Sequence, residues 1–297
     1  MTADHIHHIA VIGAGNMGRQ IALASALAGY DTSLTDVSRE ALEGAEIYAG
    51  AYLAERVAKG KLSEADSVAA RARIRVAHTL EDSVRDADFV IEAAVEKLDV
   101  KRRLFADLDR LAPDHAVLAT NSSAIVSSSI ATATGRPDKV LNTHFFNPAL
   151  VMKLVEVVQG PHVSEETAQT TIALARNLGK VPVHLHKEVD GFLLHRILDA
   201  VFREAGWLLE MGVASIEDID LACVHGAGHP MGPFRLLDLI GLDLAHLMAM
   251  ERFRKTGDAA ELPMPQLAAR VAAGHLGRKS GQGWYDYHGG NLDGGTA

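Results

Sequence analysis

The sequence is poor in cysteine and has no long apolar run. Cys223 is the only cysteine among the 297 residues, so no disulfide can form within the chain. A chain without disulfides is typical of a reducing compartment, and we expect a cytoplasmic protein. No apolar stretch reaches the roughly 20 residues of a membrane-spanning helix. The N-terminus also lacks the basic and apolar segments of a signal peptide, so no membrane partner is expected.

Positive charge is also scarce. There are 29 lysine and arginine residues against 38 aspartate and glutamate residues, and the net charge is -9. Nucleic acids bind basic surfaces, so we expect no nucleic-acid partner. A small anionic ligand on a local basic patch is still compatible with this balance. With 48% hydrophobic and 23% charged residues, the chain has a globular composition and is long enough for one large domain or two ordinary ones.

The first two-thirds of the chain alternates between short β-branched runs and helical stretches. This alternation is typical of βαβ units and predicts an α/β domain with a mostly parallel sheet. Residues 39–72 differ, because a charged helical pattern with a break near Gly60 predicts an antiparallel helical hairpin. The expected strands are Ile9–Ile12, Thr32–Thr35, Phe89–Ile91, Ala116–Ala119, Val140–Thr143, Leu154–Val158 and Val181–Leu185.

The strand pattern ends in the last third of the chain. The apolar stripe of "GFLLHRILDAVFREAGWLLEMG" predicts a long helix that Gly212 closes, and Ser215 has the capping-box spacing that starts the next helix. We therefore expect an α/β domain over residues 1–188 and an all-α domain over residues 189–297. The polar tail, residues 288–297, is expected to be disordered.

The stretch "HHIAVIGAGNMG" contains Gly13, Gly15 and Gly18 in G-x-G-x-x-G spacing. An apolar run precedes these glycines, an Ala-rich helical stretch follows them, and Asp36 comes at the end of the next expected strand. Such glycines permit a tight turn, close approach of the backbone to a pyrophosphate, and close helix–strand packing. Asp36 suits the two hydroxyls of an adenosine ribose and repels a 2′-phosphate. The pattern predicts a Rossmann-type domain that binds NAD rather than NADP.

The stretch "LNTHFFNPALVMKLVEV" places His144 and Glu156 in an otherwise apolar run. Histidine titrates near neutral pH, and a nearby carboxylate can orient the ring and stabilise its charged form. Their spacing of twelve residues fits a strand–turn–strand return that could bring the two side chains together. These residues alone leave two interpretations open: a catalytic base with its orienting carboxylate, or two ordinary residues of a β-rich core. On this stretch by itself we favour the second.

Two histidine pairs raise the question of a metal site. They are His184 with His186, and His225 with His229. Neither pair has a carboxylate or cysteine that clearly completes a ligand set. The second pair lies in a Gly-rich stretch, where a spacing of four does not put both rings on one helix face. We predict no metal.

Six motifs occur in order along the chain: "GAGNMG", "EAAVEKLDVKRRLF", "TNSSAI", "THFFNPALVMKLVEVV", "HPMGPFRLLDLIGLD" and "GRKSGQGWYDY". With them the chain resembles the L-3-hydroxyacyl-CoA dehydrogenase family, especially the short bacterial 3-hydroxybutyryl-CoA dehydrogenases, over nearly its whole length. The resemblance implies an N-terminal NAD domain, a C-terminal helical domain that forms a homodimer, and a substrate site between them. The implied reaction is NAD-linked interconversion of a 3-hydroxyacyl-CoA thioester and its 3-ketoacyl form.

The resemblance also implies roles for single residues. His144 matches the catalytic base, Glu156 matches the carboxylate that orients it, and Ser123 matches the serine that hydrogen-bonds the reacting oxygen. The positions that match the cofactor site are Gly13, Gly15, Met17, Gly18, Asp36, Glu96, Lys101, Asn121, Ser123 and Asn147.

Lys59, Lys61 and His195 bear on the substrate. Lys59 and Lys61 lie where relatives contact CoA, although a solvated face with a Glu55–Lys59 pair explains them equally well. His195 stands in "GFLLHRIL", where the family has an asparagine that faces the reacting end of the substrate.

A histidine at position 195 can copy one asparagine N–H, but it is bulkier and can carry a charge. Three interpretations are open. The substitution is tolerated in an active acyl-CoA enzyme, which we favour. Alternatively, the substrate is a free 3-hydroxy acid of the carnitine or gulonate kind. In the third interpretation, activity is weakened or lost. A complete loss would be compatible with a non-catalytic NAD-binding structural protein.

Overall fold

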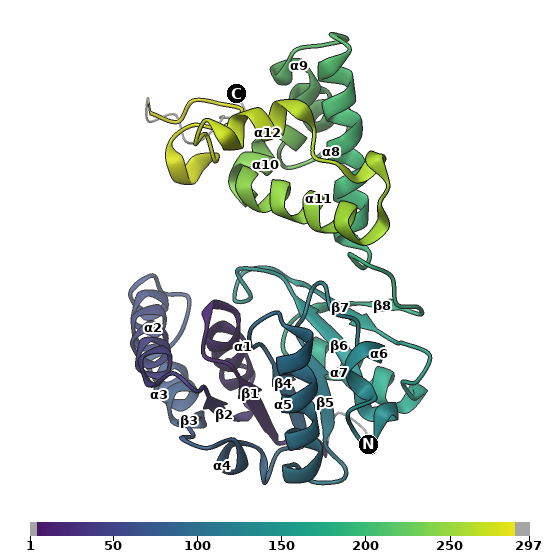
Figure 1. Ribbon diagram of the computed structural model, residues 1–297. Helices are drawn as coiled ribbons and strands as arrows, with labels where there is room; N and C mark the ends of the chain where they lie inside the picture. Colours follow the sequence, from purple (N-terminus) through teal and green to yellow (C-terminus); the bar gives the residue numbers. More distant parts are fainter. Residues whose placement is uncertain (1–4, 289–297) are drawn as a thin grey trace. The chain divides into compact units, whose positions relative to one another are not determined.

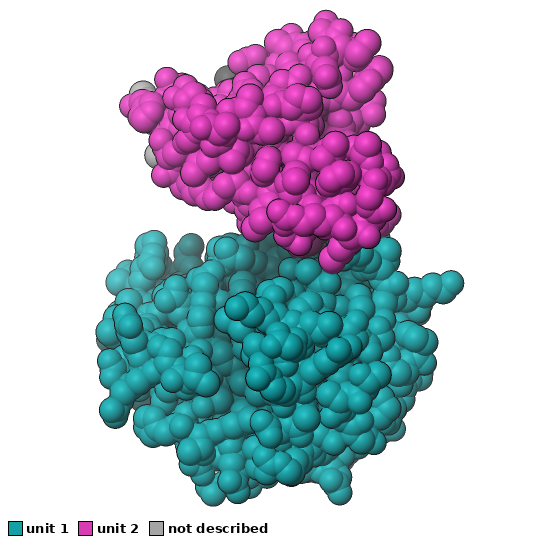
Figure 2. Space-filling model, viewed as in Figure 1, with its two compact units in different colours: residues 1–193 teal, residues 194–297 magenta. Residues whose placement is uncertain are grey.

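A computed structural model describes residues 5–288 of the chain. It divides into two compact units, Met1–Leu193 and Leu194–Ala297, which Figure 2 colours separately. Glu188, after which the sequence predicted a domain boundary, lies in the first unit. The predicted disordered tail, residues 288–297, lies outside the described residues except for His288. Among the helices of residues 5–288, none combines the length and the apolarity needed to cross a membrane.

The first unit is built on an eight-stranded sheet of order β3-β2-β1-β4-β5-β6-β7-β8. Neighbouring strands run parallel, except that β6 and β7 are antiparallel. The predicted α/β architecture with a mostly parallel sheet is therefore confirmed. The strands are β1 (His8–Ile12), β2 (Asp31–Thr35), β3 (Ile74–Val76), β4 (Phe89–Glu92), β5 (Val117–Thr120), β6 (Val140–Phe145), β7 (Leu154–Val158) and β8 (Val181–Leu185).

Helices cover both faces of this sheet (Figure 1). They are α1 (Asn16–Leu27), α2 (Arg39–Ala58), α3 (Glu64–Arg73), α4 (Leu80–Val84), α5 (Leu98–Leu111), α6 (Ser128–Ala131) and α7 (Glu165–Asn177), with the short η2 (Pro137–Lys139). In β1, Ile9 and Val11 join the core beside α1 and α7, whereas Ala10 and Ile12 join the core beside α4, α5 and α6. Successive side chains of a strand point to opposite faces, so a sheet covered on both sides needs apolar residues throughout.

Helices α2 and α3 form the predicted hairpin. Ser38 and Ser63 cap their N-termini through side-chain hydrogen bonds, and Gly60 takes a positive φ of 64° between them. The hairpin packs on α1 through a small core around Leu23 and Leu53. The strand β3, directly after α3, was not expected from the sequence. Its three residues are too few to produce an alternating pattern, and none of them is fully buried.

The described part of the second unit is built from helices, as predicted. Ser215 Oγ accepts a hydrogen bond from Asp218 N at 3.1 Å and donates one to Asp218 Oδ2 at 2.8 Å, so Ser215 is the N-cap of α9. The core includes Phe234 and Trp284, whose ring centroids lie 4.7 Å apart. The helices are α8 (Leu194–Glu210), α9 (Ile216–Leu221), α10 (Pro233–Ile240), α11 (Leu242–Thr256) and α12 (Pro265–Ala272), with the short η3 (Ala222–Gly226), η4 (Ala259–Glu261) and η5 (Arg278–Ser280).

Candidate active site

The glycine-rich turn joins β1 to α1 at the carboxyl end of the sheet. Gly13 has a φ of +105°, and a Cβ there would lie 2.6 Å from the carbonyl oxygen of Ala93. A Cβ on Gly18 would lie 1.7 Å from the carbonyl oxygen of Gly13. Gly15 precedes α1 without a side-chain cap, and a Cβ there would meet nothing within 4 Å. The turn thus leaves room at Gly15 for a phosphate group, which the amides of a helix N-terminus favour.

Asp36 follows β2 and points back to this turn. Its Oδ2 accepts a hydrogen bond from Ala14 N at 2.7 Å, and its Oδ1 accepts one from Ser38 N at 2.8 Å. The carboxylate therefore ties the glycine turn to the start of α2. Each carboxylate oxygen has a further lone pair, so the group can still accept hydrogen bonds from the hydroxyls of a ribose.

His144 and Glu156 are register partners on the antiparallel strands β6 and β7. His144 Nδ1 lies 2.9 Å from Glu156 Oε2. Both side chains are buried, with 6% and 1% of their area exposed. An ionised carboxylate only accepts hydrogen bonds, so Nδ1 carries the proton and donates it. In a neutral imidazole Nε2 is then the basic atom, as a general base requires.

Aromatic rings and backbone pack against this pair. The ring centroid of His144 lies 4.4 Å from that of Phe146 and 5.7 Å from that of Phe192. Glu156 Oε1 accepts a hydrogen bond from Leu193 N at 3.1 Å. Phe192 is buried and has a φ of 47°, which is uncommon for a residue with a side chain. The end of the first unit therefore helps to hold the ring and the carboxylate in place.

The loop after β5 lies next to His144, at the carboxyl ends of the parallel strands. Asn121 Oδ1 accepts a hydrogen bond from Phe145 N at 2.9 Å, next to His144 in the chain. Asn121 N donates to the carbonyl oxygen of Glu92 at 2.7 Å. Asn121 therefore connects the loop to both β4 and β6. Ser123 follows two residues later and is half-buried.

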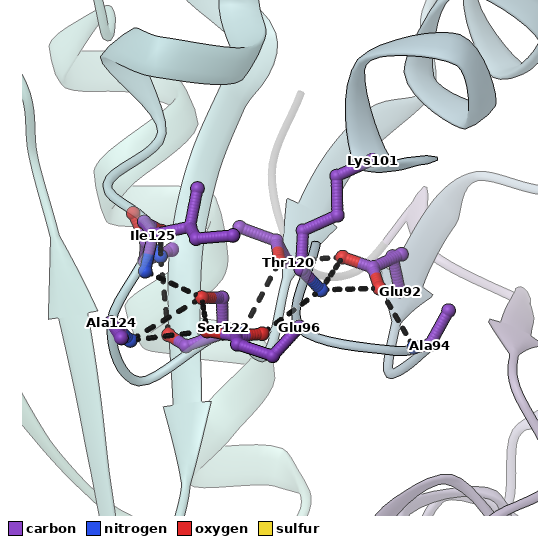
Figure 3. Close-up of polar contacts among 9 residues, drawn as sticks. Glu92, Ala94, Glu96, Lys101, Thr120, Ser122, Ala124 and Ile125 are labelled. Atoms are coloured by element: carbon purple, nitrogen blue, oxygen red, sulfur yellow. Dashed lines mark hydrogen bonds and ion pairs between the residues drawn. The ribbon is translucent and has the colours of Figure 1, made fainter. Parts of the chain in front are cut away.

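A buried ion pair connects the end of β4 to α5 (Figure 3). Lys101 Nζ lies 2.7 Å and 2.9 Å from the two carboxylate oxygens of Glu92, and 3.3 Å from Glu96 Oε2. Thr120 Oγ1 donates to Glu92 Oε2 at 2.6 Å, and Ala94 N donates to Glu92 Oε1 at 2.7 Å. Burying a charge is costly unless it is paired and hydrogen-bonded. Glu92 and Lys101 meet this condition, because each charge is paired and the carboxylate accepts two further hydrogen bonds.

Asn147 links the loop after β6 to the start of α1. Its Oδ1 accepts hydrogen bonds from Asn16 Nδ2 at 3.0 Å and from Gln20 Nε2 at 3.4 Å. Gln20 is buried, and its Oε1 accepts a hydrogen bond from Leu150 N at 3.5 Å. Met17 is partly buried and packs against the core beside α1. The expected cofactor residues Met17 and Asn147 thus lie around the first turn of the helix that follows the glycines.

The expected substrate residues Lys59, Lys61 and His195 come from other elements. Lys59 follows α2 and forms an ion pair with Glu55, with 57% of its side chain exposed. Lys61 is also exposed. His195 is the second residue of α8 and belongs to the second unit.

The first histidine pair lies at β8, where the ring centroids of His184 and His186 are 4.2 Å apart. His184 Nε2 lies 2.8 Å from Gln159 Oε1. Burial and the neighbouring His186 lower the pKa of His184. Across residues 5–288, no group of three or more His, Cys, Asp or Glu side chains is placed to hold a metal ion.

Glu92, Ser122 and Gln20 were given no role from the sequence. They are polar residues with exposures of only 0%, 3% and 3%. A buried polar residue keeps its place through its partners, and these partners lie on other strands and loops. For Glu92 a local signal existed, because this acid ends an apolar strand nine residues before Lys101 on the next helix.

Two family models match the chain. The NAD-binding domain of 3-hydroxyacyl-CoA dehydrogenase matches residues 8–189, and the C-terminal domain of 3-hydroxyacyl-CoA dehydrogenase matches residues 191–287. The chain belongs to the 3-hydroxyacyl-CoA dehydrogenase family. Both the resemblance inferred from the six motifs and NAD as the cofactor are thereby confirmed.

Two curated members of the family and one solved structure are similar to this chain over more than nine-tenths of their own length. The probable 3-hydroxybutyryl-CoA dehydrogenase of Bacillus subtilis (strain 168) is 42% identical over 95% of this chain and 98% of its own. The mitochondrial hydroxyacyl-coenzyme A dehydrogenase of Homo sapiens is 38% identical over 95% of this chain and 91% of its own. The crystal structure of (S)-3-hydroxybutyryl-CoA dehydrogenase PaaH1 from Ralstonia eutropha aligns with a TM-score of 0.88 at 36% identity. That alignment covers 95% of this chain and 99% of the other.

Proposed function

We propose that this chain catalyses the NAD-dependent interconversion of a short-chain L-3-hydroxyacyl-CoA and the corresponding 3-ketoacyl-CoA. The observation that carries the proposal is the buried pair of His144 and Glu156, with Nδ1 and Oε2 2.9 Å apart. The pair lies on β6 and β7. His144 is near the carboxyl end of β6, and the glycine turn of the NAD-binding domain follows the carboxyl end of the parallel strand β1. Relatives named 3-hydroxybutyryl-CoA dehydrogenases support the substrate class.

In the oxidative direction, Nε2 of His144 takes the proton of the 3-hydroxyl group while the C–O bond becomes a carbonyl. Glu156 holds the Nδ1–H side of the ring and stabilises the imidazolium that forms. Ser123 donates a hydrogen bond to the reacting oxygen. NAD⁺, when bound, supplies the acceptor for the hydride that leaves carbon 3. The two-electron oxidation of the alcohol is thus balanced by reduction of NAD⁺ and protonation of His144.

For the cofactor, we propose that the turn of Gly13, Gly15 and Gly18 binds the pyrophosphate and that Asp36 binds the adenosine ribose. The support is the space at Gly15, where a Cβ would meet nothing within 4 Å, and the position of Asp36 against Ala14. The other cofactor residues of this proposal lie at the carboxyl end of the sheet and along the start of α1. They are Met17, Glu96, Lys101, Asn121, Ser123 and Asn147.

For the CoA group, we propose that Lys59 and Lys61 contact its phosphates. Both side chains are exposed, and Arg56 on the last turn of α2 adds a third positive charge. Because the chain carries a net charge of -9, such a basic group offers an anionic ligand a local site. His195 is proposed to contact the reacting end of the acyl group in place of the family's asparagine.

We also propose that the second unit forms a homodimer. On α8, Ile197 and Trp207 are each 52% exposed, and Met211, directly after this helix, is 60% exposed. On α11, Leu244 and Leu247 are 45% and 52% exposed. Large exposed apolar patches mark interaction surfaces, and a second copy of the same surface would cover them. A cytoplasmic location is proposed as well, with a single cysteine in the chain as its support.

The proposed activity is tested by measuring NADH oxidation with acetoacetyl-CoA, free acetoacetate and 3-dehydrocarnitine in parallel. Turnover of the thioester alone supports the acyl-CoA activity. Turnover of a free keto acid without the thioester would replace it by the alternative of a free 3-hydroxy acid substrate. Silence with all three substrates while NADH still binds would reject the short-chain acyl-CoA proposal.

The same assay on His195→Asn addresses the position where the chain departs from the family. If histidine is a tolerated substitution, the variant is expected to turn over acetoacetyl-CoA at a rate similar to the wild type. A large gain with acetoacetyl-CoA would mean that the natural substrate differs or that the site is weakened.

A further inference from the structure

Glu96 contacts both neighbours of Ser123 (Figure 3). Its Oε1 accepts a hydrogen bond from the Ser122 hydroxyl and another from Ala124 N at 3.2 Å. Ser122 Oγ in turn accepts a hydrogen bond from Ile125 N at 2.8 Å. One carboxylate therefore fixes the loop on the residue before Ser123 and on the residue after it, 26 and 28 positions along the chain from Glu96.

The other carboxylate oxygen of Glu96 faces Lys101. Lys101 Nζ lies 3.3 Å from Glu96 Oε2, and 2.7 Å and 2.9 Å from the two oxygens of Glu92. An ammonium group has three N–H donors, and three carboxylate oxygens surround this one. The Lys101 side chain is only 1% exposed, whereas that of Glu96 is 41% exposed. The buried ammonium group of Lys101 therefore forms an ion pair with the partly exposed carboxylate of Glu96.

Glu92 anchors Lys101 to the sheet. It is the last residue of β4 and is fully buried. Besides Lys101 it binds Thr120 Oγ1 at 2.6 Å and Ala94 N at 2.7 Å. Ser122 N donates to the same Thr120 Oγ1 at 3.1 Å. Hydrogen bonds and the ion pair thus hold the ends of β4 and β5 together. Glu96 connects this group to the loop that carries Ser123.

We propose that Glu96 is a positioning residue for Ser123 and that the Glu92–Lys101 pair holds Glu96 in the orientation this requires. The proposal rests on the proposed role of Ser123 at the reacting oxygen. Ser123 is half-buried in the loop after β5, so its hydroxyl is only as well placed as the loop itself. Because a misplacement of about 1 Å can cost roughly a hundredfold in rate, a carboxylate that fixes both neighbours controls turnover without touching the substrate.

A double-mutant cycle between Glu96→Ala and Ser123→Ala tests the proposal. In the wild-type background Glu96→Ala is expected to lower kcat for acetoacetyl-CoA reduction about ten- to a hundredfold. In the Ser123→Ala background it is expected to lower the residual kcat less than about twofold, because the group it positions is gone. Equal factors in both backgrounds would overturn the proposal. So would a Glu96→Ala effect confined to the Kd of NADH, which would leave Glu96 with its proposed cofactor role alone.

Substitutions at Ser122 test whether its hydroxyl is needed to hold Glu96. Ser122→Ala removes the hydroxyl that binds Glu96, and it is expected to lower kcat by a factor similar to that of Glu96→Ala. Ser122→Thr keeps the hydroxyl and is expected to recover most of the rate. Asp99→Ala is the matched control, since Asp99 is an acid on α5 with 74% of its side chain exposed. A Ser122→Thr variant as slow as Ser122→Ala would contradict the role of the hydroxyl.

Lys101 needs a paired substitution, because its removal alone leaves Glu92 as an uncompensated buried charge. In Glu92→Gln/Lys101→Met, the amide oxygen of the glutamine still accepts a hydrogen bond, and Glu96 loses its ammonium partner. This double variant is expected to lower kcat in the wild-type background and to leave it within about twofold in the Glu96→Ala background. An equal loss in both backgrounds would remove Lys101 from the proposal.

Amide hydrogen exchange separates the positioning role from the proposed activity. The Ala124 amide, which binds Glu96, is expected to exchange faster in Glu96→Ala than in the wild type. In Ser123→Ala it is expected to exchange at the wild-type rate. This readout needs no turnover, so it supports or overturns the positioning role even if every substrate proves inactive. Unchanged exchange in Glu96→Ala would overturn it.

Discussion

His144 and Glu156 are directly opposite each other on two antiparallel strands, with Nδ1 and Oε2 2.9 Å apart. The sheet register sets this distance, because a shift of one strand by one residue would turn its side chain to the other face, away from the partner. The second oxygen of Glu156 is held by Leu193 N at 3.1 Å. The carboxylate is therefore fixed at both oxygens before any substrate arrives, which is the condition for an orienting group.

Replacing His144 by alanine is expected to lower kcat with acetoacetyl-CoA by about 10²–10⁴-fold, the range for loss of a general acid–base group. The Kd of NADH, measured by fluorescence titration, should not change. Glu156→Gln keeps an acceptor for Nδ1–H but loses the charge that stabilises the imidazolium, so it should lower kcat by a smaller factor. His78→Ala, at an exposed histidine, is the control. Near-normal turnover by His144→Ala would show that the base assignment is wrong.

Asp36 is expected to select NAD over NADP. Asp36→Ala should improve NADPH binding relative to NADH by roughly tenfold, because a carboxylate repels the 2′-phosphate. The same substitution also removes the acceptor for Ala14 N and Ser38 N, so affinity for both cofactors should fall. Asp36→Asn separates the two effects, since the amide keeps one acceptor oxygen without the charge. Fluorescence titrations give both ratios, and an unchanged NADPH to NADH ratio in both variants would refute the selection.

Lys59 and Lys61 are expected to contribute to CoA affinity. Alanine at either position should raise the KM for acetoacetyl-CoA about two- to fivefold, the range for exposed ionic contacts. The effect should shrink with added salt, because exposed charges are screened. Both kcat and the Kd of NADH should remain as in the wild type. Lys139→Ala serves as the control, since the Lys139 ammonium binds the carbonyl oxygen of Asp114. If neither alanine variant changes the KM for acetoacetyl-CoA, the interpretation of these lysines as a solvated face is favoured.

The exposed apolar residues of α8, together with Met211 directly after it, are expected to lie in a dimer interface. Sedimentation equilibrium should give twice the 31.8 kDa chain mass for the wild type. Trp207→Glu/Met211→Glu should shift the protein towards the monomer mass, because two buried charges without partners oppose association. Val68→Glu is the control, at an apolar residue of α3 that is 70% exposed. A wild-type monomer, or a dimer unaffected by the double substitution, would contradict the proposed interface.

Asp88 is a titrating group at the amino end of the sheet. Its Oδ2 accepts hydrogen bonds from His7 N at 2.7 Å and His8 N at 3.0 Å, and its Oδ1 lies 2.9 Å from His115 Nε2. Burial acts to raise the pKa of Asp88, but the hydrogen bonds outweigh burial and hold that pKa below its usual 3.8. A carboxyl whose pKa is lowered by folding stabilises the native state above its unfolded pKa. That contribution is lost as the pH falls through the folded pKa.

The free energy of unfolding should therefore decline as the pH falls below about 3.8. Asp88→Asn should lower it by about 1–3 kcal/mol near neutral pH, where the hydrogen bonds to a charged group are lost. The variant should also show a smaller decline at acid pH than the wild type. Urea unfolding across the pH range measures both effects. Asp86→Asn is the control, since the Asp86 side chain is 69% exposed. Parallel pH curves for wild type and Asp88→Asn would exclude Asp88 as a source of acid sensitivity.

Much of the fold was predictable from the sequence because the signals are local. The strands Leu154–Val158 and Val181–Leu185 were expected with the bounds that β7 and β8 have. The glycine turn was predictable because only glycine suits the φ of +105° at Gly13 and the close contact at Gly18. By contrast β3, three residues long, is too short to produce a periodic pattern. The twelve-residue return from His144 to Glu156 was predictable for the same local reason, since adjacent strands joined by a short connection usually pair.

The sequence by itself determined the alternation of strands and helices, the cofactor turn and the family, because these depend on neighbouring residues and ordered motifs. Only the tertiary structure decided which distant polar groups meet. Glu96 binds Ser122 across 26 residues, and Asn147 binds Asn16 across 131. Such hydrogen bonds depend on the order of the strands in the sheet and on burial. The periodicity of apolar residues in the sequence predicts neither. A buried polar group without a hydrogen bond is costly. Buried polar groups such as the Ser122 hydroxyl are therefore paired in the folded chain, but with residues that are distant in the sequence and that its local pattern does not identify.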